Sequence, residues 1–242
     1  MKRILITGKN GYVGNSFEEW LERYPNHYQV DKISVRDEAW RVYDFSSYDV
    51  ILHVAGIVHR KETKKNKDHY YRVNLELSYE IACKAKREGV KQFIFMSTMA
   101  VYGEEGEINK DIIITENTKP KPNSHYGKSK HLAEKRIQQL SSGNFIILIL
   151  RPPMIYGPNC PGNYRKLEKI AKYSPVFPLL KNKRSMLHIH NLCSFIETCI
   201  LEKYGGIAFP QDSKYVSTLE MVCEIAKSRG KNIRFSKILG LL

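Results

Sequence analysis

Tyr126 and Lys130 are the two side chains in this sequence best suited to acid–base chemistry. They are four residues apart, so on a helix both face the same side. A lysine ammonium beside a phenol favours the phenolate and lowers the pKa of the tyrosine from about 10 toward neutrality. We therefore expect Tyr126 to act as an acid/base catalyst. The spacing alone is weak evidence, because Tyr28 and Lys32 share it on a segment expected to be a strand.

A second stretch with chemical potential is 7–14, which places three glycines at even spacing directly after the apolar run 4–6. A strand that runs through such glycines into a helix is typical of a dinucleotide-binding loop. Gly8 lets the chain turn sharply, Gly11 lets the backbone approach a pyrophosphate, and Gly14 lets the helix pack close to the sheet. The phosphates would lie at the helix N-terminus, where free N–H groups and the dipole favour negative charge. The alternative is an ordinary glycine-rich turn.

The end of the second expected strand bears on the choice of dinucleotide. A helix over about 15–24 ends near Pro25, and a strand over 30–36 follows. At the end of that strand a carboxylate binds the ribose of NAD, whereas a basic residue pairs with the 2′-phosphate of NADP. Arg36 occupies this place, so the sequence favours NADP. NAD remains an alternative, because Asp37 follows Arg36 and would meet the ribose if the strand register were shifted by one residue.

Apolar runs that alternate with amphipathic segments predict an α/β fold with a Rossmann-type, doubly wound parallel sheet. Further strands are expected at 41–43, 50–56, 92–96 and 145–150, and a helix at 76–88. Ligands bind outside the carboxyl ends of such strands. Ser97 and Thr98 directly follow one of them, so they should lie at the same edge as the glycine loop.

The chain is expected to divide into a dinucleotide-binding domain at 1–159 and a small, mostly helical substrate-binding region at 160–242. Helices in the second part are expected at 167–173, 192–201 and 219–227.

The composition points to an anionic partner, because 39 Lys and Arg against 25 Asp and Glu give a formal charge of +14. The anionic partner could be nucleic acid, an acidic membrane or a phosphorylated small molecule. The one dense basic cluster consists of Arg60, Lys61, Lys64, Lys65 and Lys67. It lacks the interleaved aromatic residues of a single-strand binding platform, so we expect a solvated loop and no nucleic acid.

Cysteine and histidine usage predicts neither disulfides nor a metal. The five cysteines are an odd number without a Cys-x-x-Cys pair, which is typical of reduced thiols in a cytoplasmic protein. His188 and His190 alternate as on a strand, but no third ligand is near them. The longest apolar runs are too short to span a bilayer, so no membrane association is expected.

Seven motifs in this order resemble the extended short-chain dehydrogenase/reductase family, the nucleotide-sugar epimerases and their relatives. The motifs are Thr7-Gly8-x-x-Gly11-Tyr12-Val13-Gly14, Asp44-Phe45, His53-x-Ala55-Gly56, Asn74, Ser97-Thr98-x-x-Val101-Tyr102-Gly103, Tyr126-x-x-x-Lys130 and Arg151-Pro152-Pro153-Met154-Ile155-Tyr156-Gly157-Pro158. The resemblance implies that Tyr126 is the general base and acid. It also implies that Lys130 holds the nicotinamide ribose and tunes Tyr126, and that Thr98 binds the sugar hydroxyl.

The same resemblance implies contacts to NADP or NAD along the sheet edge. They are Gly8, Asn10, Gly11, Tyr12, Val13, Gly14, Arg36, Asp44, Phe45, Ala55, Gly56, Asn74, Lys130 and Pro153. Asp44 and Phe45 would lie by the adenine, and the backbone of Ala55 and Gly56 by the ribose and pyrophosphate. Asn74 would have a structural or cofactor-side role. Contacts to the substrate are implied for Ser97, Asn163 and Arg184.

Met99 and Ala100 narrow the expected reaction, because the family's 4,6-dehydratases carry an Asp-Glu pair at these positions. Without carboxylates the site has no evident means to eliminate water. This favours an epimerase acting at C4 of a UDP-hexose, with a 4-keto-sugar reductase as the alternative. Met154 stands where many 4-epimerases have a substrate-binding asparagine, so the sequence does not identify the sugar. A non-catalytic dinucleotide sensor is a third possibility, and the family resemblance implies a homodimer.

Overall fold

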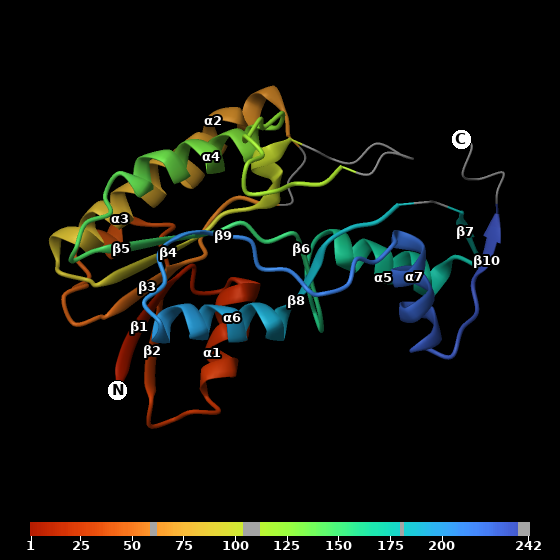
Figure 1. Ribbon diagram of the computed structural model, residues 1–242, viewed down its shortest axis with the longest axis horizontal. Coiled ribbons are helices and arrows are strands. Elements are labelled where there is room, and N and C mark those ends of the chain that lie inside the picture. The colour runs from red at the N-terminus through yellow and green to blue at the C-terminus, as the bar shows by residue number, and fades with distance from the viewer. Residues whose placement is uncertain (59–61, 104–111, 180–181, 237–242) are drawn as a thin grey trace.

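A six-stranded, entirely parallel sheet forms the centre of the computed structural model, which describes residues 1–58, 62–103, 112–179 and 182–236 (Figure 1). The strand order is β2-β1-β3-β4-β5-β9. The strands are β1 (Lys2–Thr7), β2 (Tyr28–Ile33), β3 (Val50–His53), β4 (Gln92–Met96), β5 (Ile146–Leu150) and β9 (Gly206–Ala208). All adjacent pairs are parallel, as in Thr7 beside Ile33 and His53 beside Phe95. The prediction of a doubly wound parallel sheet is confirmed.

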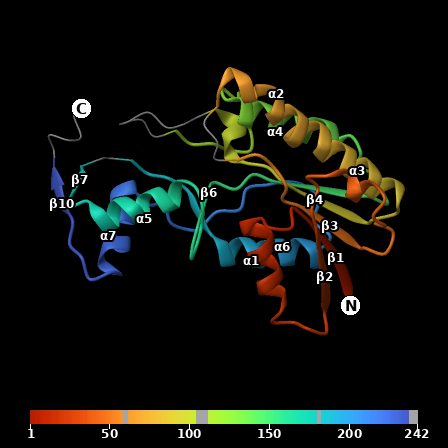
Figure 2. The same ribbon diagram turned by 180° about the vertical axis from the view of Figure 1, so that it is seen from behind.

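Helices cover both faces of this sheet (Figures 1 and 2). On one face lie α1 (Tyr12–Leu21) and α6 (Ile189–Leu201). On the other lie α2 (Lys67–Tyr70), α3 (Ser78–Arg87) and α4 (His125–Gln138). Each face has its own apolar core, because successive strand residues point to opposite sides. Ile4 and Ile6 pack toward α1 and α6, whereas Leu5 belongs to the opposite core.

A smaller body extends from the sheet and contains α5 (Asn163–Tyr173), α7 (Thr218–Lys227), β7 (Val176–Pro178) and β10 (Arg234–Ser236) (Figure 1). Its separate core includes Ala171, Phe177 and Val222. A two-stranded sheet of β6 (Met154–Tyr156) and β8 (Met186–His188) lies between the two bodies. The chain then returns to the large body through α6 and β9, so the domain division at residue 159 stays a prediction.

The expected strand at 41–43 is wrong, because the chain forms a 3₁₀ turn, η1 (Glu38–Arg41), at this point. The carboxylate of Asp37 accepts a hydrogen bond from the amide of Ala39 and caps this turn. The Trp40 side chain is buried beneath it. A second difference is the π-helical stretch η3 (Tyr71–Leu77), which lengthens the helix before α3. His190 lies in α6 rather than on a strand with His188.

The remaining chain-wide expectations concern the membrane, the cysteines and the basic cluster. Across the described ranges, no helix combines the length and apolarity that crossing a bilayer requires. All five cysteines are free thiols. Lys65 and Lys67 of the basic cluster are exposed, while Arg60, Lys61 and the Lys64 side chain lie outside the described part.

Candidate active site

Three strand ends meet where the sequence predicts the site. A Cβ built on Gly8, after β1, would lie 3.0 Å from the backbone nitrogen of Ala55, after β3. The ammonium of Lys130 donates a hydrogen bond of 2.8 Å to the carbonyl of Met96, the last residue of β4. The same ammonium would lie 3.3 Å from a Cβ on Gly56. The carboxyl ends of β1, β3 and β4 and the first half of α4 therefore enclose one site.

The glycine loop fits a dinucleotide. Gly8 has φ of +111°, a conformation that favours glycine, and a Cβ on Gly14 would lie 2.9 Å from the Ile6 side chain. Helix α1 begins at Tyr12 after Gly11, with neither a capping side chain nor an acidic residue in its first turn. The first-turn amides of α1 thus have no side-chain acceptor among the described residues and can bind a pyrophosphate.

Tyr126 lies in the first turn of α4 beside Thr98, which follows β4. Burial raises the pKa of Tyr126 to about 12, the hydrogen bond with Thr98 opposes this rise, and Tyr70 adds to it. Lys130 alone therefore does not bring the pKa of Tyr126 toward neutrality, and the further lowering expected from a positively charged nicotinamide ring stays a prediction. The physical reason is that the Lys130 ammonium is bonded to Met96 while the phenol loses hydration.

Lys130 is itself perturbed. Its side chain is almost fully buried, over the ring of Phe95. Burial lowers the pKa of Lys130 to about 7, and the carboxylate of Glu134 opposes this shift. Glu134 is one helical turn further along α4, so it lies on the same face as Lys130. This arrangement supplies a buried ammonium whose charge depends on a nearby anion.

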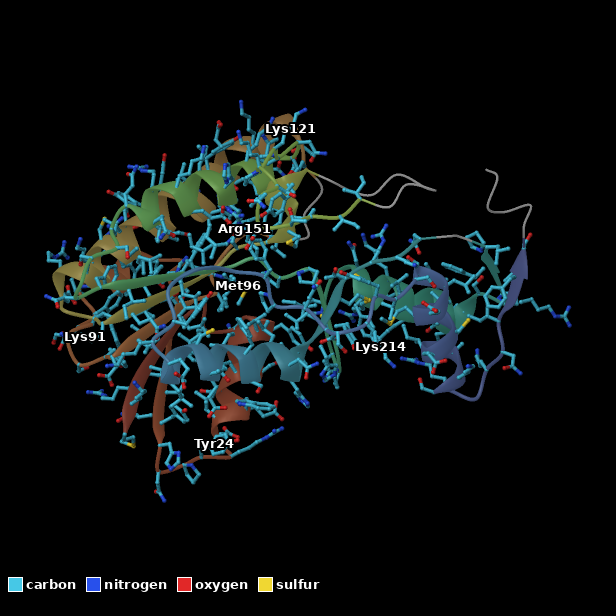
Figure 3. The ribbon with its side chains drawn as sticks, in the orientation of Figure 1. Tyr24, Lys91, Met96, Lys121, Arg151 and Lys214 are labelled. Atoms are coloured by element: carbon cyan, nitrogen blue, oxygen red, sulfur yellow. The ribbon has the colours of Figure 1, made fainter. Side chains whose placement is uncertain are left out.

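Glu134 and Arg151 are site-supporting residues whose interaction the sequence did not predict. The Glu134 carboxylate accepts hydrogen bonds from Arg151 Nε at 2.9 Å, from Arg151 Nη2 at 2.7 Å and from the Ser97 hydroxyl at 2.5 Å. Arg151 also donates to the Tyr102 hydroxyl at 2.7 Å. Figure 3 shows Arg151 between the sheet and α4. The Ser97 hydroxyl thus faces the protein interior, and its contact with a substrate stays a prediction. The signal in the sequence was the carboxylate four residues after Lys130.

Asn74 joins the loop after β3 to α4. Its side-chain oxygen accepts a hydrogen bond of 2.8 Å from the amide of Ile57, and its nitrogen donates to the Ile57 carbonyl and to the Ser129 hydroxyl, both at 3.2 Å. The Ser129 hydroxyl in turn donates to the Tyr126 carbonyl at 2.9 Å. Asn74 is fully buried. Of the two roles expected for it, structural or cofactor-side, burial favours the structural one.

The residues expected around the adenosine differ in their surroundings. Arg36 is exposed and forms no ion pair with any described residue, whereas the carboxylate of Asp37 is engaged in capping η1. Asp44 is exposed, and hydrogen bonds with Ser46 lower the pKa of its carboxyl. Phe45 is fully buried in the core beneath α3, so its side chain has a packing role. Contact of Arg36 and Asp44 with a cofactor stays a prediction, as it does for Asn10, Val13 and Pro153.

The expected substrate residues Asn163 and Arg184 flank the sheet of β6 and β8. Asn163 is exposed at the start of α5, and Arg184 is exposed and pairs through its backbone with Val216 at 2.9 and 3.0 Å. The Tyr12 hydroxyl donates a hydrogen bond of 2.9 Å to the carbonyl of Pro158, in the loop after β6. The glycine loop is therefore joined directly to the segment that leads to Asn163.

Within the described ranges, no group of three or more His, Cys, Asp or Glu side chains is placed to hold a metal ion. The site is thus built from a phenol, an ammonium, a hydroxyl and backbone amides. These groups can move a proton and bind an anionic ligand.

Comparisons with known proteins bear on the family and the fold. A family model described as "NAD dependent epimerase/dehydratase family" matches residues 4–204. The UDP-glucose 4-epimerase of Vibrio cholerae is 29% identical over an alignment of 250 positions, which covers 93% of this chain and 75% of that protein. The UDP-glucuronic acid 4-epimerase of Bacillus cereus, solved with NAD, superposes with a TM-score of 0.79 at 21% identity, covering 97% of this chain and 87% of that one. The dTDP-4-dehydrorhamnose reductase of Bacillus anthracis, solved with NADP, gives 0.77 at 20% identity, covering 100% and 86%.

Proposed function

This chain belongs to the NAD dependent epimerase/dehydratase family, as an NAD(P)-dependent sugar-nucleotide enzyme, and we propose that it epimerises C4 of a UDP-hexose through a transient keto intermediate. The observation that carries the proposal is the meeting of Thr98, Tyr126 and Lys130 at the sheet edge that also holds the glycine loop. The curated UDP-glucose 4-epimerase relative supports the choice of substrate and carbon.

The first-turn amides of α1 would hold the pyrophosphate of the dinucleotide, and Lys130 would hold the nicotinamide ribose. The bound cofactor supplies a hydride acceptor and a positively charged ring. The residues of this chain move the proton and orient the sugar.

Tyr126 takes the proton from the C4 hydroxyl as that carbon is oxidised, and returns it to the keto oxygen after the sugar has turned over. Thr98 binds the same hydroxyl and, through its hydrogen bond with Tyr126, favours the phenolate. Because burial raises the pKa of Tyr126 to about 12, a positive charge near the phenol is needed for it to act as a base at neutral pH.

Asn163, at the start of α5, and Arg184, shortly before β8, are proposed to hold the uracil-diphosphate end. An epimerase must keep its keto intermediate bound while the sugar turns, so a nucleotide anchor remote from C4 is required. The hydrogen bond from the Tyr12 hydroxyl to the Pro158 carbonyl would hold this nucleotide-binding segment at a fixed position relative to the glycine loop. The homodimer remains a proposal by family analogy, which sedimentation of the purified protein tests.

The test is to incubate the purified protein with UDP-glucose or UDP-N-acetylglucosamine without added reductant and to follow the products by NMR. Multiple turnovers to the 4-epimer are the expected result. Inactivity on both sugars, together with stoichiometric NADPH consumption on a nucleotide-linked 4-keto sugar, would contradict it.

That second outcome corresponds to the alternative, an NADPH-dependent 4-keto-sugar reductase. The exposed Arg36 favours it, because a guanidinium without an ion-pair partner among the described residues is available to a 2′-phosphate, and NADPH is the usual reductant of such enzymes. A non-catalytic dinucleotide sensor is less favoured, because binding alone does not require Thr98, Tyr126 and Lys130 to converge.

A further inference from the structure

Glu62 reaches from the segment after β3 to the first turn of α4. Its Oε2 accepts a hydrogen bond of 2.9 Å from the amide of His125, and its Oε1 accepts one of 2.8 Å from the amide of Tyr126. These amides belong to the first two residues of the helix, where N–H groups have no acceptor within the helix. A carboxylate at this place also interacts favourably with the helix dipole.

The backbone around the catalytic tyrosine is thus held from several sides. The Ser124 hydroxyl accepts a hydrogen bond of 3.0 Å from the amide of Gly127, and the Ser129 hydroxyl donates one to the Tyr126 carbonyl. Both serines lie within or beside α4 itself. Glu62 comes from 64 residues earlier in the chain and therefore fixes the Tyr126 backbone relative to another part of the fold.

That other part is the segment after β3, which contains Ala55 and Gly56, the residues expected to contact the cofactor. Ile57 in the same segment is bonded to Asn74. We propose that Glu62 is a positioning residue for Tyr126, whose carboxylate fixes the first turn of α4 so that the phenol stays aligned with Thr98. This inference rests on the proposed role of Tyr126 as acid and base.

The Glu62 charge gives the proposal a signature in pH dependence. Tyr70 of α2 is the titratable group that adds to the raised pKa of the Tyr126 phenol, whereas the Glu62 carboxylate meets α4 at the backbone amides of His125 and Tyr126. Lys130 lies one helical turn further along α4 and donates to the Met96 carbonyl. An anion at the helix N-terminus disfavours the phenolate. Replacing Glu62 by glutamine removes that charge, so the titration of Tyr126 should move to lower pH.

The test compares Glu62→Gln and Glu62→Asp with the wild type and with Glu220→Gln. Glu220 is the matched control, because its carboxylate caps α7 through the amide of Ser217 at 2.6 Å, in the separate small body. For Glu62→Gln we expect kcat to fall about tenfold, KM to stay within twofold, and the pH midpoint of kcat to shift down, since one acceptor and one charge are lost. Glu62→Asp should recover part of kcat, and Glu220→Gln should match the wild type.

A second readout needs no substrate. The ultraviolet difference titration of the phenol, taken as wild type minus Tyr126→Phe, should also move to lower pH in Glu62→Gln. This measurement stands even if none of the tested sugars is turned over, so a failed inference can be told from a failed assignment of the reaction. An unchanged kcat, an unshifted titration, or an equal loss of kcat in Glu220→Gln overturns the proposal. If Glu62→Gln does not fold, kcat of Glu62→Asp decides it: a value below that of the wild type at unchanged KM supports the proposal, and a wild-type kcat overturns it.

Discussion

The carboxylate of Glu134 is held by the guanidinium of Arg151 through two hydrogen bonds, of 2.9 and 2.7 Å, between side chains that are only 3% and 6% exposed. Glu134 lies one helical turn beyond Lys130, and its carboxylate opposes the fall in the Lys130 pKa, to about 7, that burial causes. Loss of this ion pair would therefore affect both the free energy of unfolding and the charge on Lys130.

Arg151→Met should destabilise the protein strongly, because it leaves the Glu134 carboxylate buried without its cation. Breaking a buried ion pair in this way costs about 3–5 kcal/mol in the free energy of unfolding. Urea denaturation measures it. Arg229→Met is the control, because Arg229 pairs with Glu168 at 3.2 Å but is 40% exposed, and such pairs contribute about 1 kcal/mol or less. Similar losses in the two variants would show that the buried pair has no special role.

Tyr126→Phe should reduce turnover about 10²- to 10⁴-fold, since only the acid/base hydroxyl is lost. Cofactor affinity should stay close to that of the wild type, which fluorescence titration with NAD and NADP checks. Tyr173→Phe removes a hydroxyl from an exposed tyrosine of α5 and serves as the control. Near-native activity of Tyr126→Phe on a sugar that the wild type turns over would rule out the catalytic assignment.

The glycine loop and the Tyr126/Lys130 pair could be predicted because their signals are local. Gly8, Gly11 and Gly14 serve one turn and one helix start, and four-residue spacing on α4 brings Lys130 to the face of Tyr126. The strand at 41–43 was mispredicted because a short apolar alternation also suits a 3₁₀ turn that buries one tryptophan.

Contacts between distant segments gave no local signal. Glu62 meets Tyr126 across 64 residues, and Glu134 meets Arg151 across 17, from another element. The effect of burial on the pKa of Tyr126 could not be predicted for a related reason, because burial depends on how α4 packs and the Lys130 ammonium turns to Met96.

Arg36→Ser should weaken the binding of NADP and leave that of NAD nearly unchanged, and the wild type should bind NADP more tightly. The reason is the guanidinium at the expected ribose position, which makes no ion pair within the described ranges. Dissociation constants at several salt concentrations provide the test, because a contact between exposed charges weakens as salt rises. Arg23→Ser removes the same charge at the far end of α1 as a control. Equal wild-type affinities, or tighter NAD, would contradict this prediction.

Stability should fall as the pH drops below about 6.5, in part because of His53. Its ring is fully buried between Thr7 and Ser78, and burial lowers its pKa to about 3, with a further contribution from Lys130. Between these pH values the unfolded chain binds a proton that the folded protein does not, so folding is penalised by at most about 1.4 kcal/mol per pH unit. Urea denaturation of the wild type and His53→Asn from pH 7 to 4 measures it. A pH dependence that is the same in both would exclude His53 as its source.

The most direct test of the account follows deuterium on C4 of UDP-glucose, with catalytic amounts of protein and no added reductant. An enzyme that oxidises and reduces the same carbon without releasing its cofactor keeps the label in the molecule through many turnovers. We predict that the 4-epimer retains deuterium at C4, and that Tyr126→Phe forms almost none of it. Loss of the label during epimerisation, or full activity of Tyr126→Phe, would contradict the account.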